Sequence, residues 1–315
     1  MIEPRGSWVA IPTPFDADGS IRFDVFEHLI AFHAENASCA LLVMGSCGEA
    51  TLLTSEERRA IIRRITRFAR GRIAVFFGTT CASTRDTVSL TRYAEGEGAD
   101  GVVLTVPPYV TPPADAVAEH FITVAKSVAL PVALYNNPSR VGVTLAPETI
   151  ASINQETPNV TIDKEAVADA SQIADVLVAS ARRVRVYCCD YPKYGLIPPT
   201  LALGGSGIAG VTGNMAPAEM AEIAQPFGAG TNVEEWRRKY FAILPLMKAM
   251  YWFTNPVVVK AGLNLMGFEV GSVRQPLADL RGAKLEQLKT LIAELGLRER
   301  YARYIQRRDA FAARG

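Results

Sequence analysis

The stretch PNVTIDKEA, residues 158–166, combines the features that decide the fold. Four residues with the character of a strand, Val160 to Asp163, run directly into Lys164 and Glu165. Lysine is scarce in this chain, because only eight of its 33 basic residues are lysines. A lysine at the end of a buried strand is therefore not explained as an ordinary surface residue, which indicates that it has a specific role.

Seven further short runs of strand character recur along the chain, separated by amphipathic segments. They are continuous rather than alternating, as expected of strands that are covered on both faces. The predicted strands are Trp8–Ile11, Ala40–Met44, Ile73–Phe77, Gly101–Thr105, Val132–Tyr135, Val160–Asp163, Val184–Cys188 and Ile208–Val211. The predicted helices between them include Phe23–Glu35, Ser55–Ala69, Thr84–Glu97 and Asp115–Ser127. Thr54 and Glu57 have the spacing of a capping box, which predicts where the second helix begins.

Eight strand–helix units within about 225 residues match the size of a closed parallel barrel. The sequence therefore predicts an α/β fold, a (β/α)8 TIM barrel, as the catalytic domain over residues 1–225. A doubly wound open sheet is the structural alternative, but no GxGxxG motif follows the first predicted strand.

After residue 226 the predicted strands end, and residues 226–315 are expected to form a C-terminal helical extension. Its predicted helices are Glu234–Tyr251, Pro256–Met266 and Lys284–Leu295. We expect Lys260 to be a surface lysine on a helix outside the barrel. The arginine-rich tail from Arg298 onward predicts a solvated terminal helix.

The composition excludes several classes of function. The net charge of +1 gives no electrostatic basis for binding nucleic acid or an anionic membrane. Five cysteines form no CxxC pair, which favours a reducing cytoplasm, and no signal peptide is evident. His28 and His33 are five residues apart, off a shared helical face, and His120 stands alone, so we expect no metal site.

Side chains at the carboxyl ends of barrel strands face the active site, which places Lys164 and Tyr135 on neighbouring strands. Desolvation disfavours the charged form of such a lysine, and a free amine attacks a ketone or aldehyde to form a Schiff base. A neighbouring phenol carries the protons that this reaction requires. The alternative from spacing alone is a lysine paired structurally with Asp163 or Glu165.

The glycine-rich turn GSCGEA, residues 45–50, includes Gly48 and has backbone N–H groups that can bind a small carboxylate. The Ser46 hydroxyl and the Cys47 thiol are further donors in this turn. A tight turn without a ligand is the alternative. Cys47 as a nucleophile is disfavoured, because no histidine lies nearby in sequence. Arg140 is placed to hold a second carboxylate, with a structural ion pair as the alternative.

Six segments, taken in order, resemble the dihydrodipicolinate synthase/N-acetylneuraminate lyase family of Schiff-base-forming lyases. They are VAIPTPF, GSCGEA, YNNPSR, DKEA, GIAGVTGN and NPVVVKAGLNLMG. The resemblance implies a (β/α)8 barrel with a C-terminal helical extension, a homotetramer built as a dimer of dimers, and no cofactor. By position it implies that Lys164 forms the Schiff base and that Tyr135 supplies the phenol. The substrate-binding residues that it implies are Ser46, Cys47, Gly48, Arg140, Tyr109 and Ala209.

Some residues depart from the family pattern. Cys47 replaces a threonine, and Val110 stands where the synthases carry a second tyrosine that reaches across the dimer, so that proton relay is expected to be interrupted. Ser55 and Ala82 replace polar residues that bind inhibitory lysine in regulated synthases. The segment CCDYPKYG, residues 188–195, is expected to form a longer turn than usual.

The predicted function is that of a Schiff-base-forming lyase acting on pyruvate or a related 2-oxo acid and an aldehyde, most like a 4-hydroxy-tetrahydrodipicolinate synthase. The alternatives are a catabolic 2-keto-3-deoxy acid aldolase or dehydratase, or an enzyme similar to N-acetylneuraminate lyase. A non-catalytic sensor that binds a carboxylate is the alternative from a different class. The predicted partners are small molecules, without nucleic acid or a membrane.

Overall fold

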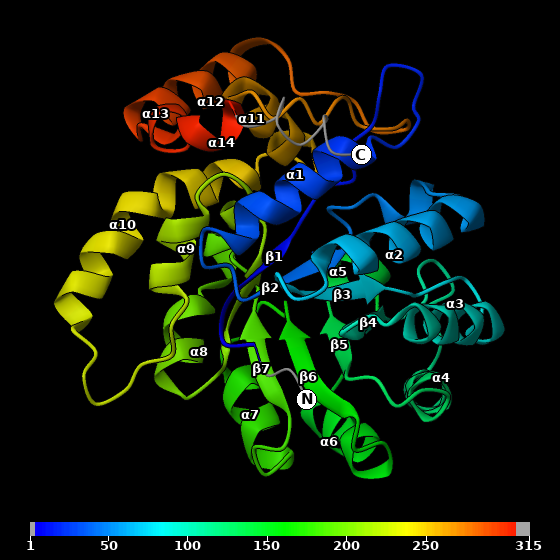
Figure 1. Ribbon diagram of the computed structural model, residues 1–315. Coiled ribbons are helices and arrows are strands. Elements are labelled where there is room, and N and C mark those ends of the chain that lie inside the picture. Colours follow the sequence, from blue (N-terminus) through cyan, green and yellow to red (C-terminus); the bar gives the residue numbers. More distant parts are fainter. Residues whose placement is uncertain (1–3, 307–315) are drawn as a thin grey trace.

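The computed structural model describes residues 4–306 and shows a barrel of parallel strands surrounded by helices (Figure 1). Each strand pairs in parallel with the next one along the chain, and β1 also pairs with β8, which closes the barrel. The eight strands within the described residues are β1 (Gly6–Ala10), β2 (Ala40–Val43), β3 (Ala74–Gly78), β4 (Gly101–Thr105), β5 (Val132–Asn136), β6 (Val160–Glu165), β7 (Arg185–Cys188) and β8 (Gly207–Gly210). The predicted fold class, a (β/α)8 TIM barrel, is confirmed.

Aromatic side chains fill part of the barrel interior. The ring centroid of Trp8 on β1 lies 5.0 Å from that of Phe76 on β3 and 5.5 Å from that of Tyr187 on β7. All three residues are fully buried. In barrels of this type each interior layer comes from alternate strands, and these three residues come from odd-numbered strands. The interior is therefore a packed core rather than a pore.

Helices cover the outside of the barrel and continue beyond β8. The helices of the first part are α1 (Phe23–Ala34), α2 (Ser55–Ala69), α3 (Thr84–Glu97), α4 (Ala114–Lys126), α5 (Pro138–Val141), α6 (Pro147–Glu156), α7 (Ser171–Ala179), α8 (Ile197–Ala202) and α9 (Pro217–Ile223). The helices that follow are α10 (Val233–Met250), α11 (Val257–Met266), α12 (Gly282–Glu294), α13 (Leu297–Arg300) and α14 (Ala302–Gln306). Three short 3-10 turns, η1 (Ala50–Leu52), η2 (Pro192–Tyr194) and η3 (Thr212–Asn214), lie in loops that follow strands.

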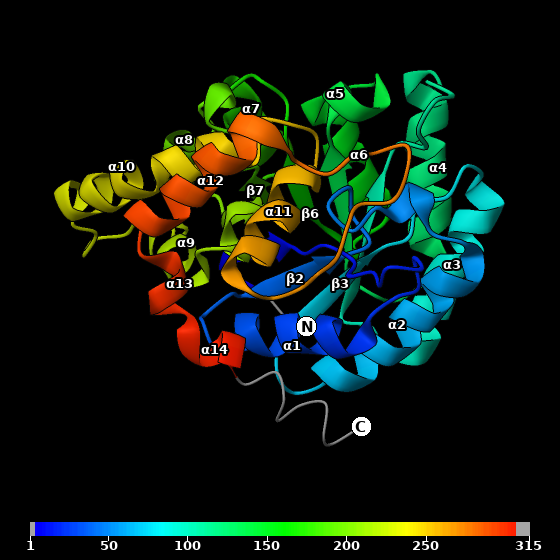
Figure 2. The same cartoon turned by 90° about the horizontal axis from the view of Figure 1, so that it is seen from above.

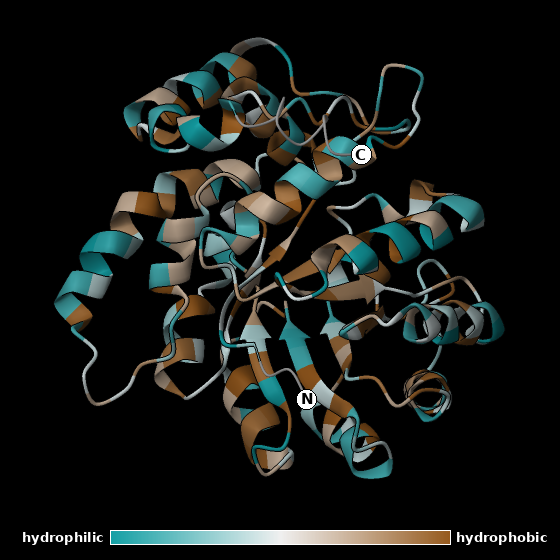
Figure 3. Ribbon diagram, in the orientation of Figure 1, coloured by the Kyte–Doolittle hydropathy of each residue, from teal (hydrophilic) through white to brown (hydrophobic). Residues whose placement is uncertain are grey.

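Helix α2 shows how the sequence pattern determines local structure. Thr54 accepts a hydrogen bond from the backbone N–H of Glu57, whose side chain accepts one from the N–H of Thr54, so the predicted capping box is confirmed. Ile61, Ile62 and Ile65 form its buried face. Figure 3 shows that residues are separated by hydropathy, with hydrophobic residues on β1 and β2 and hydrophilic residues on the outer side of α2. The carboxyl end of β6 is hydrophilic in this view.

The observed elements begin and end within a few residues of the predicted ones. Strand β1 begins two residues before its predicted start and ends one residue before its predicted end. Strand β6 continues to Glu165 instead of ending at Asp163. Charged residues at the end of an apolar run predict the end of a strand. Here they extend it, because Tyr135↔Lys164 and Asn136↔Glu165 remain paired in register with β5.

The end of the described chain packs against the first helix. Tyr301 and Tyr304 contact Phe32 of α1 with ring centroids 5.2 and 5.3 Å away, and both tyrosines are buried. Figure 2 shows α14 beside α1. The expectation of a solvated terminal helix was therefore wrong for the part of the tail up to Gln306, because its tyrosines bury their rings. The rest of the tail lies outside the described residues.

Candidate active site

A cavity of about 220 Å³ lies at the carboxyl ends of the strands. Drug-sized ligands occupy pockets of roughly 300–1,000 Å³, so this cavity suits a smaller molecule. Its lining residues come from the ends of β1, β2, β5, β6 and β8, from the segments that follow the strands, and from the segment between α10 and α11: Ala10, Leu42, Ser46, Tyr135, Asn137, Ser139, Arg140, Lys164, Ala166, Cys189, Tyr191, Tyr194, Ala209, Gly210, Val211, Tyr251, Thr254 and Asn255.

Lys164 and Tyr135 lie side by side in this cavity. They are direct partners in the register of β5 and β6. The Lys164 Nζ atom lies 3.6 Å from the centroid of the Tyr135 ring, and only 4% of Lys164 is exposed. The Tyr135 hydroxyl accepts a hydrogen bond of 2.6 Å from Asn137 Nδ2, which fixes its orientation. An amine and a phenol therefore share one small, largely enclosed space.

The two acids beside Lys164 lie on the other face of β6, because side chains alternate along a strand. Glu165 accepts hydrogen bonds from Asn136 Nδ2 (3.1 Å) and from the backbone N–H of Val167 (2.7 Å). Burial and the neighbouring charge of Glu165 raise the pKa of Asp163 well above its ordinary value. Within residues 4–306, no ion pair joins Lys164 to either acid. The structural alternative for this lysine thus has no support from the observed contacts.

The turn after β2 presents Ser46 to the cavity but keeps Cys47 and Gly48 out of its lining. A Cβ atom on Gly48 would lie 2.8 Å from the backbone nitrogen of Met44, so only glycine fits this close approach. The Thr13 hydroxyl donates a hydrogen bond of 2.7 Å to the carbonyl oxygen of Gly48. Cys47 is fully buried, and this burial raises the pKa of its thiol, so Cys47 remains a neutral thiol rather than a nucleophile.

Arg140 is an exposed residue on α5 that also lines the cavity. Its Nη1 atom lies 3.5 Å from Thr254 Oγ1, at the limit of a hydrogen bond. No ion pair occupies its guanidinium among the described residues. The side chain is therefore able to receive an anionic group that enters the cavity.

Residues 3–295 of this chain match the model of the Dihydrodipicolinate synthetase family. The chain belongs to this family. The family resemblance predicted from the motifs is thus confirmed over nearly the whole chain.

Individual relatives agree with the family match. The 4-hydroxy-tetrahydrodipicolinate synthase of Thermoanaerobacter sp. (strain X514) is 33% identical over 293 residues, which cover 93% of this chain and 97% of the relative. The protein of the same name from Citrifermentans bemidjiense is 36% identical over 293 residues, covering 93% and 99%. The chloride-inhibited dihydrodipicolinate synthase of Acinetobacter baumannii, crystallised in complex with pyruvate, superposes with a TM-score of 0.86 at 31% identity, covering 94% of this chain and 100% of that one.

The dihydrodipicolinate synthetase resemblance also implied substrate contacts for Tyr109 and Ala209. Ala209, on β8, lines the cavity. Tyr109 does not: its side chain is 98% exposed, and its backbone φ of 78° is in the left-handed region. In this chain alone, the expectation that Tyr109 contacts the substrate is not met, because the loop after β4 turns its side chain into solvent. Val110 is also exposed.

Sequence reasoning missed a group of tyrosines that line the cavity. Tyr191 stacks on Tyr251 with ring centroids 4.5 Å apart, and both line the cavity together with Tyr194. The Tyr251 hydroxyl donates a hydrogen bond to the buried Asp190 carboxylate. Asp190 also accepts hydrogen bonds from two backbone N–H groups after β8. The residue types gave no indication of this contact, because Tyr251 follows α10, far from the strand ends in sequence.

The interpretation of Lys260 as a surface lysine was wrong. Only 1% of this residue is exposed, and its Nζ atom lies 2.6 Å from Glu49 Oε1. Nζ also donates a hydrogen bond of 2.8 Å to the carbonyl oxygen of Ser272. The error has a physical reason. The Glu49 carboxylate makes burial of the Lys260 ammonium group possible, and Glu49 lies in the turn after β2, far in sequence from α11.

Two further classes of feature were searched for in the described residues. No group of three or more His, Cys, Asp or Glu side chains there is arranged to hold a metal ion. No helix between residues 4 and 306 has both the length and the apolar character that crossing a bilayer requires.

Proposed function

We propose that this protein is a 4-hydroxy-tetrahydrodipicolinate synthase, which condenses pyruvate with aspartate semialdehyde through a Schiff base on Lys164. The observation that carries the proposal is the placement of Lys164 Nζ 3.6 Å from the ring centroid of Tyr135 inside a small cavity. Mere binding of a carboxylate requires no such pairing of an amine with a phenol. The pyruvate complex of the Acinetobacter baumannii relative supports pyruvate as the first substrate.

The proposed reaction begins when the free amine of Lys164 attacks C2 of pyruvate. The carbinolamine that results loses its oxygen as water, which leaves an imine between Nζ and C2. Tyr135 transfers the protons in these steps, and its own hydroxyl is held by Asn137. The imine then loses a proton from C3, and the enamine that forms attacks the aldehyde carbon of the second substrate to make the new carbon–carbon bond.

Two parts of the cavity are proposed to receive the two carboxylates. The turn at Ser46 lines the cavity and receives the carboxylate at C1 of pyruvate. The backbone N–H groups of the adjacent Cys47 and Gly48 are proposed to donate to this carboxylate as well, although neither residue lines the cavity. Arg140 receives the carboxylate of aspartate semialdehyde. Ala209 forms part of the cavity wall. An acceptor with its own carboxylate thus fits this cavity.

Incubation of the purified protein with pyruvate and aspartate semialdehyde tests the named activity. We expect the cyclised product to accumulate only when both substrates are present. If no product forms while pyruvate still reacts with Lys164, the Schiff-base chemistry stands and the named second substrate is wrong.

A 2-keto-3-deoxy acid aldolase or dehydratase is the second candidate. It is favoured by Val110, which stands where a relay tyrosine was expected, is exposed and does not line the cavity. Incubation with a panel of 2-keto-3-deoxy acids tests this candidate. Release of pyruvate from one of them would support an aldolase over the synthase, and loss of one water from an otherwise intact acid would support a dehydratase.

We further propose that the chain works in the cytoplasm as a homotetramer, a dimer of dimers, without a cofactor. The exposed side chains of Tyr109 and Val110 are apolar surface that a subunit contact would cover. Light scattering after size-exclusion chromatography tests the assembly: we expect the mass of four chains. The mass of one chain would contradict this part of the proposal.

A further inference from the structure

A buried ion pair joins the C-terminal extension to the turn that follows β2. Lys260 Nζ on α11 lies 2.6 Å from Glu49 Oε1, and both side chains are almost completely buried. The other oxygen of this carboxylate, Glu49 Oε2, accepts a hydrogen bond of 2.7 Å from the backbone N–H of Arg274. Both oxygens of Glu49 are thus held by residues that lie beyond the barrel strands in sequence.

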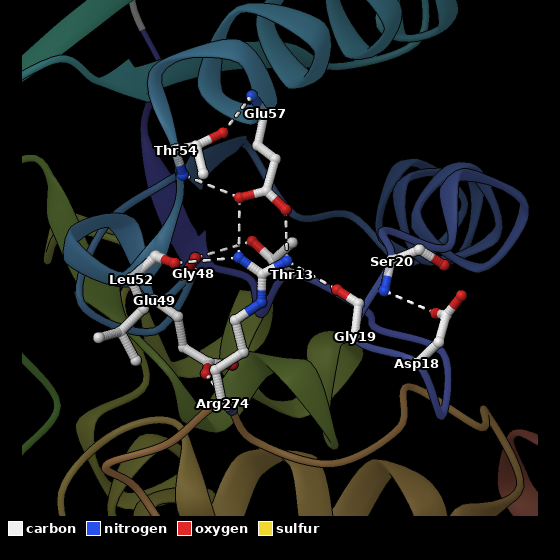
Figure 4. Close-up of polar contacts among 10 residues, drawn as sticks. All are labelled: Thr13, Asp18, Gly19, Ser20, Gly48, Glu49, Leu52, Thr54, Glu57 and Arg274. Atoms are coloured by element: carbon white, nitrogen blue, oxygen red, sulfur yellow. Dashed lines mark hydrogen bonds and ion pairs between the residues drawn. The ribbon is translucent and has the colours of Figure 1, made fainter.

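The surroundings of the pair extend this connection to two more loops. Lys260 Nζ and the Arg274 guanidinium each lie 4.1 Å from the centroid of the Phe15 ring, in the loop after β1. Figure 4 shows the Arg274 side chain between Glu57 and the carbonyl oxygens of Leu52 and Gly19. The extension therefore contacts the loops after β1 and β2 and the start of α2 in one continuous network.

Glu49 directly follows Gly48 in the turn proposed to bind the C1 carboxylate. Its backbone φ of 54° is left-handed, a conformation that a residue without local stabilisation rarely adopts. The carbonyl oxygen of Gly48 accepts a hydrogen bond from the Thr13 hydroxyl. With Thr13 bound to Gly48 and Lys260 bound to Glu49, the turn has little freedom to reorient its N–H groups.

The charge of Lys260 also acts on this turn. Burial raises the pKa of the Cys47 thiol, whereas the positive charge of Lys260 lowers it. Lys260 is thus close enough to the turn for its charge to act on the residue next to Ser46.

We propose that Glu49 and Lys260 are positioning residues for recognition of the C1 carboxylate of the 2-oxo acid. They hold the Ser46–Gly48 turn in the conformation that binds this carboxylate, although neither residue lines the cavity. This inference rests on the proposed function. It extends that function by assigning part of the substrate recognition to the C-terminal extension.

A purely structural role for the pair predicts a different result. Loss of folding stability would slow every reaction of Lys164, whatever the ligand carries. Loss of positioning would slow only the reaction of a ligand that has a carboxylate. Hydroxyacetone is a suitable comparison ligand, because it has a ketone that Lys164 can attack but no carboxylate.

The experiment measures borohydride trapping of Lys164 as a function of ligand concentration, with pyruvate and with hydroxyacetone. The variants are E49Q, K260M and the double variant E49Q/K260M. The double variant leaves no unpaired buried charge, so it remains informative if a single variant fails to fold. K239M is the matched control, because Lys239 pairs with Glu235 at 2.8 Å on the surface of α10, away from the cavity.

We expect the pyruvate concentration for half-maximal trapping to rise by about tenfold or more in the variants that fold, the factor carried by one charge-assisted hydrogen bond. Trapping with hydroxyacetone should match the wild type, and K239M should match it with both ligands. An equal loss with both ligands, or no change with pyruvate in the double variant, would overturn the inference and leave the proposed function intact. Failure of the wild type to trap pyruvate would instead overturn the proposed function, and this inference with it.

Discussion

The substitution D163N removes a buried acid directly behind the proposed catalytic lysine. Asp163 is completely buried on the outer face of β6, and Glu165 on the same face holds Asn136 and the N–H of Val167. Burial and the charge of Glu165 raise the pKa of Asp163 well above the ordinary 3.8, although Lys164 acts in the opposite direction. Asparagine keeps the shape of the side chain, cannot ionise, and can donate a hydrogen bond to Glu165.

The sign of the effect follows from proton binding. Above pH 3.8 the unfolded chain releases the Asp163 proton, while the folded protein retains it until the pH reaches the raised pKa. Over that interval the folded state binds more protons, so its free energy of unfolding falls as the pH rises, by up to about 1.4 kcal/mol per pH unit. The contribution of Asp163 to stability is thus greatest in acid and is lost on the alkaline side.

Urea denaturation of wild type and D163N between about pH 5 and pH 8 measures this contribution. We expect D163N to become more stable than the wild type with rising pH, until the difference levels off where Asp163 ionises. D169N is the matched control: the exposed Asp169 accepts hydrogen bonds from Ser171, which lower its pKa below 3.8, so it is ionised in both the folded and the unfolded state over this pH range. The stability difference between D169N and the wild type should therefore not change with pH here. A difference between D163N and wild type that does not change with pH would refute the reasoning.

Three further substitutions test the site. Y135F should slow imine formation with pyruvate by about 10²–10⁴-fold, because the proton donor is lost. Stopped-flow kinetics measure this rate, and an unchanged rate in Y135F would exclude the proposed role of Tyr135. R140A should raise the KM for aspartate semialdehyde by about tenfold or more but leave pyruvate trapping unchanged, because only the carboxylate of aspartate semialdehyde loses its partner. Steady-state kinetics and borohydride trapping measure the two effects. Equal effects on both substrates would contradict the role of Arg140. Y251F should lower the free energy of unfolding by about 1–3 kcal/mol in urea denaturation, because Asp190 loses a hydrogen-bond donor; unchanged stability would show that water replaces the hydroxyl.

The parts of the fold and site that depend on local patterns could be predicted from the sequence. Continuous apolar runs gave the strands, and the capping residues gave the start of α2. Because the carboxyl ends of barrel strands face the active site, the sequence alone predicted that Lys164 and Tyr135 lie there on neighbouring strands. Both side chains sit on elements whose register follows from the barrel itself.

The parts that depend on contacts distant in sequence could not be predicted. Lys260 is buried because Glu49 supplies its countercharge, and Tyr251 reaches the cavity because Asp190 accepts its hydrogen bond. Tyr301 is buried because α1 offers an aromatic surface. In each case the side chain carries a polar or charged group, and only a partner from another part of the chain makes its burial favourable.

The central claim is that Lys164 forms an imine with a 2-oxo acid. Its most direct test is to incubate the protein with pyruvate, reduce it with borohydride, digest it and measure the mass of each peptide, with K164M as the control. We predict that the peptide carrying Lys164 gains the mass of one reduced pyruvyl group and that K164M gains none. An unmodified Lys164 peptide under saturating pyruvate, or equal labelling of K164M, would contradict the account.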